Sequence, residues 1–403
     1  MNMNNKLFHI GVLLASVIFL FVGNRIASAN LELPTAGNNL SEHTVVGELY
    51  FYAGVVTHII DRVEEDIFGF TNTSIEFGAR LTGGGRRGEE VVATQLLSDF
   101  FIAGDRDVEI GDRVLLVSDE FSDTYFFTDF VRINALVVMG AIFLALVVIF
   151  ARAKGLNAII ALVLTCLAIF LVFIPAILSG RNIYMATIIV CLFSVVSTLL
   201  IVIGPNKKAW SAMLGCLGGV LLAGVLMAAM DIVLNLSGVV DQESQALLML
   251  STASPINLRA IIFAGVILGA VGAIMDVAMT ISSSLWEVRE VGGISDFMSI
   301  VKSGINIGRD VLGTMLNTLI LAYIGSSLSL ILVIMIHTTS YVELFNMELI
   351  IIEFVRALVG AFGMFLTIPL TALICGWLYT KGGKCPDVPL RGSKRLREGS
   401  VDS

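Results

Sequence analysis

Charged residues are scarce in this chain. They make up 14% of the sequence against 56% hydrophobic residues, and the mean hydropathy is +0.90. Soluble domains carry about 25% charged residues, so the composition predicts a membrane protein. The charges are also uneven: residues 30–131 hold nineteen acidic and six basic residues, a net −13, so the remainder of a chain at −8 carries +5. Because an acidic surface repels phosphate, we expect no nucleic-acid partner.

Cysteine and histidine are rare as well. The five cysteines fit no zinc or redox spacing, and none of them lies within residues 30–131. The stability of that region therefore does not depend on disulfides. The four histidines are scattered along the chain, and none falls in the middle of an apolar run. We expect no metal centre and no cofactor.

Motifs for intramembrane catalysis are missing. A rhomboid-like site needs a serine and a histidine within the membrane, and no histidine is placed there. A presenilin-like site needs paired aspartates in a GxGD setting, which the residues around Asp276 lack. The sequence also contains no HExxH motif and no nucleotide-binding P-loop. We therefore expect that the protein is not an enzyme.

The chain opens with an apolar run at residues 7–23, followed by Ala27-Ser28-Ala29. Residues 1–29 can be either a cleaved signal peptide or an uncleaved signal anchor. The length of the run, and Arg25 just before the small residues, favour the anchor. Either alternative places Asn30 outside the cytoplasm.

Residues 30–131 are typical of a small extracytoplasmic all-β domain. Ile75, Phe77, Ala79 and Leu81 alternate with polar residues, which is the period of a half-buried strand. A glycine-rich loop follows this strand, and three further strands are expected, at residues 91–96, 113–117 and 124–131. Short strands with such turns predict a barrel or sandwich, with a structural or docking role favoured over ligand binding.

Seven long apolar segments follow, each close to the roughly 20 residues that cross a bilayer. They are expected at residues 133–151, 156–178, 183–204, 210–236, 259–285, 311–336 and 349–379. With the first segment, the fold class is a membrane all-α bundle of about eight transmembrane helices, or seven if the first is a cleaved signal. The bundle domain covers residues 132–380, and a basic cytoplasmic tail covers 381–403.

Positive charge predicts the orientation of these segments. With the N-terminus inside, fourteen lysines and arginines fall on the cytoplasmic side, while the short outer loops hold only Arg181 and Arg259. Trp210, Trp286 and Trp377 all fall at the same, cytoplasmic interface. We therefore expect both termini in the cytoplasm.

Polar residues recur at helical spacing on three of the segments. On the segment at 259–285 this stripe comprises Gly265, Gly269, Gly272, Asp276, Thr280, Ser283 and Glu287. The corresponding stripes on the last two segments comprise Arg309, Gly313 and Asn317, and Glu353, Arg356, Gly360, Gly363 and Thr367. Because each face is unfavourable against lipid, we expect the three faces to pack together.

Two interpretations of these residues remain open. Glycines and paired charges can fix the bundle, or Asp276 can line a polar path that binds a proton, ion or solute. An ion pair within one helix is the favoured role of Glu353 and Arg356, and Arg309 and Asp310 are expected at the inner membrane edge. The candidate polar site comprises Asp276, Thr280, Ser283, Glu287, Arg309, Asn317, Glu353 and Arg356.

The chain resembles the YibE/F-like family of bacterial multi-pass membrane proteins from about Gly54 onward. The resemblance is strongest at GAVGAIMDVAMTISSSLWEV, SGINIGRDVLGTMLNTLILAYIG and FNMELIIIEFVRALVGAFGMFLTIPLTAL. It implies a multi-pass protein of the bacterial plasma membrane, with a lipid bilayer as its surroundings. It supplies no substrate and no catalytic residues.

Two functions fit these features of the sequence. The first is a transporter or permease that moves a small solute or ion along a polar intramembrane path. The alternative is a cell-envelope structural or interaction protein whose outer β-domain docks a partner. A related membrane protein or a second copy of the chain is a possible partner in either case.

Overall fold

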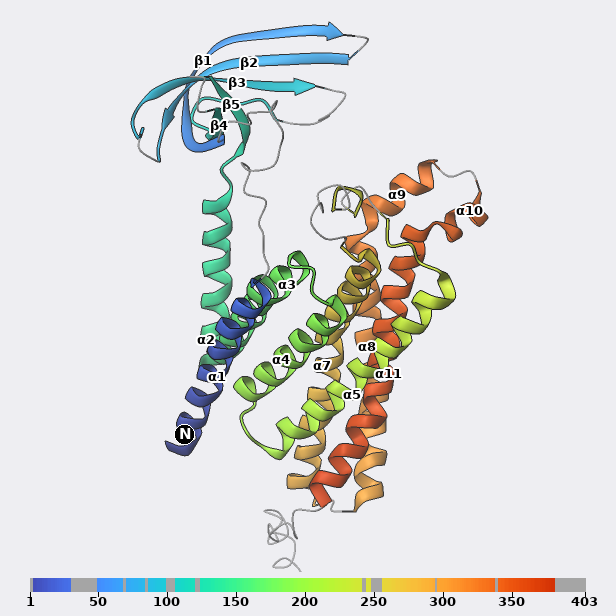
Figure 1. The fold of residues 1–403 in the computed structure, drawn as a ribbon. Coiled ribbons are helices and arrows are strands. Elements are labelled where there is room, and N and C mark those ends of the chain that lie inside the picture. The colour runs from blue at the N-terminus through green and yellow to red at the C-terminus, as the bar shows by residue number, and fades with distance from the viewer. Residues whose placement is uncertain are drawn as a thin grey trace, which may run out of the picture. The chain divides into compact units, whose positions relative to one another are not determined.

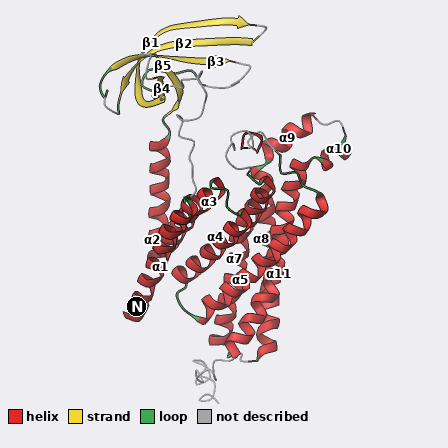
Figure 2. Cartoon of the chain, in the orientation of Figure 1, coloured by secondary structure: helices red, strands yellow, loops and turns green. Residues whose placement is uncertain are grey.

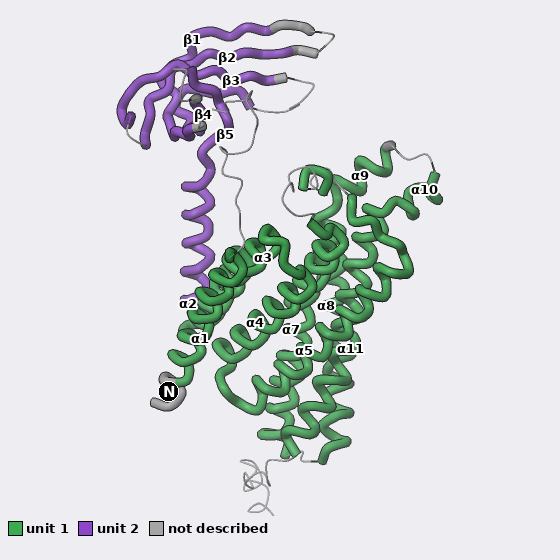
Figure 3. The backbone as a smooth tube through the Cα atoms, in the orientation of Figure 1, with its two compact units in different colours: residues 1–32, 151–403 green, residues 33–150 purple. Residues whose placement is uncertain are grey.

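The computed structural model describes residues 3–29, 49–67, 70–83, 86–98, 106–119, 124–240, 244–247, 256–293, 296–337 and 340–380. The chain falls into two compact units, shown in Figure 3. Unit 1 comprises residues 1–32 and 151–403, and unit 2 comprises residues 33–150. Figure 2 shows the described strands in yellow, and their residues all fall within unit 2.

Five strands in unit 2 form a closed barrel (Figure 1). They are β1 (Leu49–Ile67), β2 (Phe70–Leu81), β3 (Glu90–Ser98), β4 (Arg113–Asp119) and β5 (Tyr125–Phe130). The strand order is β1-β2-β3-β5-β4, and β4 pairs back onto β1. The β3–β5 pair is parallel, while the other neighbouring pairs are antiparallel. Closure pairs both edges of the sheet, which removes the aggregation hazard of an open edge.

Alternating side chains on β2 fill the barrel. Ile75, Phe77, Ala79 and Leu81 are each at most 2% exposed, and they pack with apolar residues from the other strands. The alternation in the sequence therefore predicted both the strand and its buried face correctly. The two expected architectures are also resolved, because the sheet is a barrel and not a sandwich.

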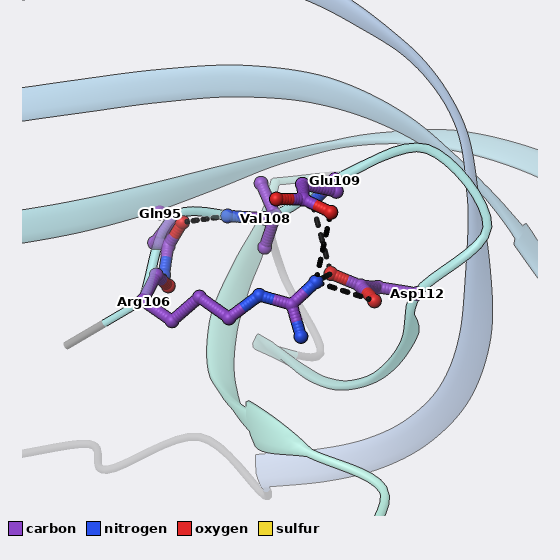
Figure 4. A network of polar contacts seen from close by, with 5 residues as sticks. All are labelled: Gln95, Arg106, Val108, Glu109 and Asp112. Carbon is purple, nitrogen blue, oxygen red and sulfur yellow. Dashed lines mark hydrogen bonds and ion pairs between the residues drawn. The ribbon is translucent and has the colours of Figure 1, made fainter.

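A polar network holds the segment before β4 against the barrel (Figure 4). The buried Gln95 amide donates to the carbonyl oxygen of Arg106 at 3.0 Å and accepts from the backbone N–H of Val108 at 3.0 Å. Arg106 in turn donates to Glu109 and Asp112 at 3.0–3.2 Å. Gln95 thus satisfies backbone groups that would otherwise be buried without partners, so its role is structural.

The longest strand, β1, was not predicted from the sequence. Its second half carries Asp61, Arg62, Glu64 and other charges, which hide the strand period. This half pairs with β2 through to Phe70, beyond the part of β1 that also pairs with β4. Exposed charges are tolerated there because both faces of the hairpin meet solvent.

Helix α2 (Ile133–Ala168) and its continuation contain two of the predicted segments. The continuation consists of the π-helical turn η1 (Ile169–Phe173) and α3 (Ile174–Leu178). Arg152, between the segments, has non-helical backbone angles with φ 49° and ψ −128°. The division between the two units also falls here, between Phe150 and Ala151.

The remaining helices belong to unit 1. They are α1 (Met3–Ala27), α4 (Ile183–Val202), α5 (Lys207–Leu234), α7 (Leu258–Gly292), α8 (Phe297–Ser326), α9 (Leu328–His337), α10 (Tyr341–Asn346) and α11 (Glu348–Thr380). Helix α1 packs on η1 and α4, where Leu20 is buried and the Phe19 and Phe193 rings stack at 4.3 Å. An apolar cavity of about 670 Å³ lies between α1, η1, α3 and α4.

Helices α5, α7 and α11 form the centre of unit 1. Their backbones approach closely at glycines: a Cβ on Gly363 of α11 would lie 2.6 Å from Cδ1 of Ile274, and one on Gly219 of α5 would clash with the Thr367 hydroxyl. Small residues allow such contacts in membrane bundles. The α11 stripe of Gly360, Gly363 and Thr367 is therefore buried and structural.

Hydrogen bonds join these three helices at one end of the unit. The hydroxyl of the fully buried Tyr379 donates a hydrogen bond to the carbonyl oxygen of Ser282 at 3.1 Å. The hydroxyl groups of Tyr379 and Ser282 also form a hydrogen bond with each other at 2.9 Å. The Ser282 hydroxyl also lies 2.7 Å from the carbonyl of Lys208, to which it donates. Trp286 packs edge-on against Tyr379 at 5.2 Å. Ser282 thus acts as a contact between these helices.

The predicted segment at 311–336 has the wrong bounds. In the structure α8 begins at Phe297, and a break at Ser327 separates it from α9. Residues 297–310 were missed because Lys302, Arg309 and Asp310 lower their hydropathy. Their other face is apolar and packs on α11, where Gly304 and Gly308 lie against Ala372 and Ile368.

Seven described helices are long and apolar enough to cross a membrane. The 46-residue stretch at 133–178 counts as one of them, although Arg152 interrupts it. The chain is thus a mostly helical, polytopic membrane protein with a small β-barrel.

Candidate functional site

Asp276 lies in the middle of α7, more than four turns from either end of the helix. Its side chain is exposed at the surface of the chain, and the described residues offer it neither a hydrogen bond nor an ion pair. A carboxyl group in the middle of a membrane helix is rare, because it is costly in hydrocarbon and needs contact with water or with a polar protein group.

The other residues of the α7 stripe share this open surface to different degrees. Gly265, Gly269, Gly272 and Glu287 are exposed, and Thr280 and Ser283 are half-buried. The buried faces of α7 instead present Ile274, Val277 and Ile281 to the core formed with α5 and α11. The expectation that the polar faces pack together is therefore wrong for α7 within one chain. Apolar burial decides which side of the helix faces its neighbours.

Helix α8 carries a second open polar stripe. Arg309, Asp310, Gly313 and Asn317 are all exposed. Because α8 begins at Phe297, Arg309 and Asp310 lie in its fourth turn and not in the loop before it. We call Gly265, Gly269, Gly272, Asp276, Arg309, Asp310, Gly313 and Asn317 together the α7–α8 polar face.

Two contacts place the stripes at the same depth. Leu285 of α7 lies beside Gly304 of α8, and Gly269 of α7 lies beside Tyr323 of α8. Asp276, Arg309 and Asp310 fall between these two contacts, and the helices run antiparallel. Asp276 and the two charges of α8 thus share one range of depth along the helices, although they do not pair with each other among the described residues.

The ion pair predicted on α11 is present. Arg356 donates to Glu353 at 2.8 Å, with side chains 30% and 19% exposed. The pair does not use all of its polar atoms: Nε of Arg356 and Oε2 of Glu353 are buried without a partner among the described residues. A buried charge with unused hydrogen-bonding atoms is unusual in a folded protein.

Sequence reasoning missed Tyr323, which links three helices. Its hydroxyl would lie 2.9 Å from a Cβ on Gly269 of α7 and 3.9 Å from one on Gly360 of α11. This hydroxyl is also buried without a hydrogen-bond partner among the described residues. Tyr323 lies within electrostatic range of Arg356 and Glu353. The tyrosine stood in an apolar run with no periodic signal, so only the packing of α8 reveals it.

The arrangement therefore contains two polar regions in contact. One is the α7–α8 polar face around Asp276, and the other is the Tyr323–Glu353–Arg356 cluster beside Gly269. Among the described residues, no group of three or more His, Cys, Asp or Glu side chains could hold a metal ion. The carboxyl, guanidinium and hydroxyl groups of these regions can bind and release protons, ions or polar groups.

A polytopic bundle with polar residues inside its spans defines a membrane protein with an intramembrane polar site. Residues 139–381 match the model of the family described as YibE/F-like protein, which is more than half of the chain. The chain therefore belongs to the YibE/F-like family. The match begins within α2, so it includes the polar site and leaves out the barrel. No curated protein and no solved structure matches the chain.

Proposed function

We propose that this protein is a transporter or permease that moves a small solute or ion across the bacterial plasma membrane. The observation that carries the proposal is Asp276, an unpaired carboxyl group in the middle of a membrane helix, bordered by glycines that leave open space. Intramembrane ionisable residues commonly mark ion and proton pathways. The path would follow the α7–α8 polar face, with the Tyr323–Glu353–Arg356 cluster at one end.

Each group has a distinct role in this proposal. Asp276 would take up a proton or cation, while Arg309 or Arg356 would bind an anionic group. The three orphaned atoms of Tyr323, Glu353 and Arg356 are available to hydrogen-bond a polar solute or its water. No catalysis is involved, and the driving force would be an ion gradient or a separate subunit.

The orientation we propose has both termini in the cytoplasm. Lys302 and Arg309 both lie in α8, and without these two the count of cytoplasmic positive charges falls from fourteen to twelve, which still leaves a strong excess over the outer loops. The barrel would then lie outside the cytoplasm.

Metabolite and ion profiling of cells that lack the gene tests the function. The cells are complemented with wild type, with Asp276→Asn, or with the control Asp231→Asn, which makes the same change near the end of α5, outside the α7–α8 polar face. Membrane levels of all variants are matched. We expect wild type and Asp231→Asn to restore the altered solute, and Asp276→Asn to fail. Restoration by Asp276→Asn removes Asp276 from the path, and an unaltered solute profile overturns transport.

A second candidate function rests on the surface of the barrel. Phe51, Val117 and Phe126 lie side by side across β1, β4 and β5, and Phe51 and Phe126 are 60% and 45% exposed. Exposed aromatic side chains are common at the centre of protein interfaces. If the barrel docks an envelope partner, a Phe51→Ser/Phe126→Ser variant loses the co-purifying protein while the barrel stays folded. Retention of every partner removes this candidate.

A further inference from the structure

One side of unit 1 exposes charges where a membrane helix normally presents apolar side chains to lipid. The exposed positions of α8 over four turns are polar or small, and comprise Lys302, Asn306, Arg309, Asp310, Gly313, Thr314, Asn317 and Thr318. By contrast, the exposed positions of α4 are apolar, including Ile188, Ile189 and Leu192. Charged groups are costly against hydrocarbon, so something other than lipid must cover the α7–α8 polar face.

The charges of this face are suited to pairing with themselves. Asp276 and Asp310 are acidic and Arg309 is basic, so the face carries both signs. In a two-fold symmetric pair the same patch from each chain meets, and an acidic residue of one chain can meet a basic residue of the other. A two-fold axis along the membrane normal keeps every residue at its own depth. Asp276 and Arg309 lie in the same depth range, so the symmetry allows them to meet.

The shape of the face also permits a close approach. An added Cβ on Gly265, Gly272 or Gly313 would meet nothing within 4 Å in a single chain. Glycines elsewhere in the bundle, such as Gly304 and Gly308, are already in contact with neighbouring helices. Open glycines on a membrane helix let the backbone of another helix approach closely.

We propose that the α7–α8 polar face is the interface between two copies of this chain, in which Asp276 of one copy pairs with Arg309 of the other. The pairing gives Asp276 and Arg309 each a partner that a single chain does not supply among the described residues. It places the polar face between two copies instead of against lipid. The interface follows from charge and depth alone, so it does not require that a solute crosses the membrane.

Cysteine cross-linking in native membranes tests the interface. Two differently tagged copies are co-expressed, each with Gly272→Cys, or one with Gly272→Cys and the other with Gly313→Cys. The control is Gly11→Cys, an exposed and equally open glycine on α1, and wild type reports any bonds from native cysteines. A stable interface keeps the two thiols close together and so raises their effective concentration. We therefore expect about tenfold more mixed-tag dimer from Gly272→Cys and Gly313→Cys than from Gly11→Cys.

Two other occupants of the face give different results. A different membrane protein would give cross-links of another mass without a mixed-tag dimer, and a water-filled groove on a single copy would give no cross-links. Either result overturns the proposal.

A bulky substitution provides an independent check. Gly272→Leu fits within one chain, because nothing lies near the added atoms, but it blocks a close partner. We expect Gly272→Leu to shift the detergent-extracted protein from dimer to monomer, while Gly11→Leu leaves the dimer unchanged. A Gly272→Leu variant that remains fully dimeric contradicts the proposed interface. The failure of the transport proposal would leave both measurements unchanged, so the two proposals can fail separately.

Discussion

Glycine has opposite roles at two kinds of position in this protein. Gly363 is buried where α11 meets α5 and α7, and Gly265 faces open space on α7. Both belong to stripes with the same helical spacing, so the residue type alone does not separate packing from an open surface. The atoms that surround each glycine decide whether it serves helix packing or lies on an open surface.

This difference predicts contrasting effects of one methyl group. In Gly363→Ala the new Cβ would lie 2.6 Å from Cδ1 of Ile274, and overpacking of this kind costs about 1–3 kcal/mol. In the monomeric protein Gly265→Ala meets no atom and gains helix propensity, so it should be neutral or slightly stabilising there. Thermal unfolding in detergent measures both, and equal melting temperatures for the two variants would contradict the packing.

The ion pair on α11 predicts a second effect at the scale of single residues. Glu353→Gln removes the charge that compensates Arg356, whose side chain is largely buried. We expect a loss of about 2 kcal/mol in the free energy of unfolding, because a partly buried guanidinium is left without its counter-charge. The double variant Glu353→Gln/Arg356→Gln should recover part of this loss. A double variant less stable than the single one would show that the pair itself is not the source of the effect.

At the scale of elements, α8 is a helix whose start is fixed by a cap and not by hydropathy. The Asp296 carboxylate accepts from the backbone N–H of Ser299 at 2.9 Å and from its hydroxyl at 3.0 Å. These bonds, led by the backbone N–H, lower the pKa of Asp296 from its ordinary value of 3.8. A cap of this kind satisfies backbone groups that the first turn of a helix leaves open.

The cap predicts a pH dependence. Since the folded-state pKa is lowered, the carboxylate stabilises the start of α8 fully above pH 3.8 and loses this effect as the pH falls below that value. Asp296→Ala should therefore reduce hydrogen-exchange protection of the first turn at neutral pH, and the difference from wild type should shrink below pH 3.8. A difference that stays constant down to pH 2 would contradict this role.

Helix α1 gives another prediction at this scale. It packs on η1 and α4, and a Cβ on Gly23 would lie 2.9 Å from Val172. A signal peptide that is removed does not need such contacts, so we expect α1 to stay on the mature chain. Mass spectrometry of the purified protein checks this, because cleavage after Ala29 would give a chain that begins at Asn30.

The sequence predicted elements well wherever one period dominated. The alternation at residues 75–81 identified β2 and its buried face, and long apolar runs located α4, α5, α7 and α11. The charged half of β1 and the polar start of α8 were missed, because their outward side chains masked the pattern of the inward ones. Tyr323 could not be predicted as part of the site, since its position depends on how α8 packs against α7 and α11.

At the scale of the whole molecule, the helical unit and the barrel have separate apolar cores. Within the helical unit Asp276 and Arg309 are exposed on an open side, while α5, α7 and α11 pack against one another at its centre. Transport, if it follows the α7–α8 polar face, therefore takes place at an edge of one chain. This arrangement explains why a second copy and a polar path are compatible, since the path then lies between two chains.

The most direct test of a polar path is the reactivity of a thiol at the position of Asp276. A water-soluble, impermeant methanethiosulfonate reacts with thiolates, which form in water and not in lipid. Asp276→Cys is compared with Leu192→Cys, an exposed apolar position near the middle of α4, and wild type gives the background from native cysteines. The account predicts that Asp276→Cys reacts about tenfold faster than Leu192→Cys or more. Equal, background-level rates at both positions would contradict a polar path through this protein.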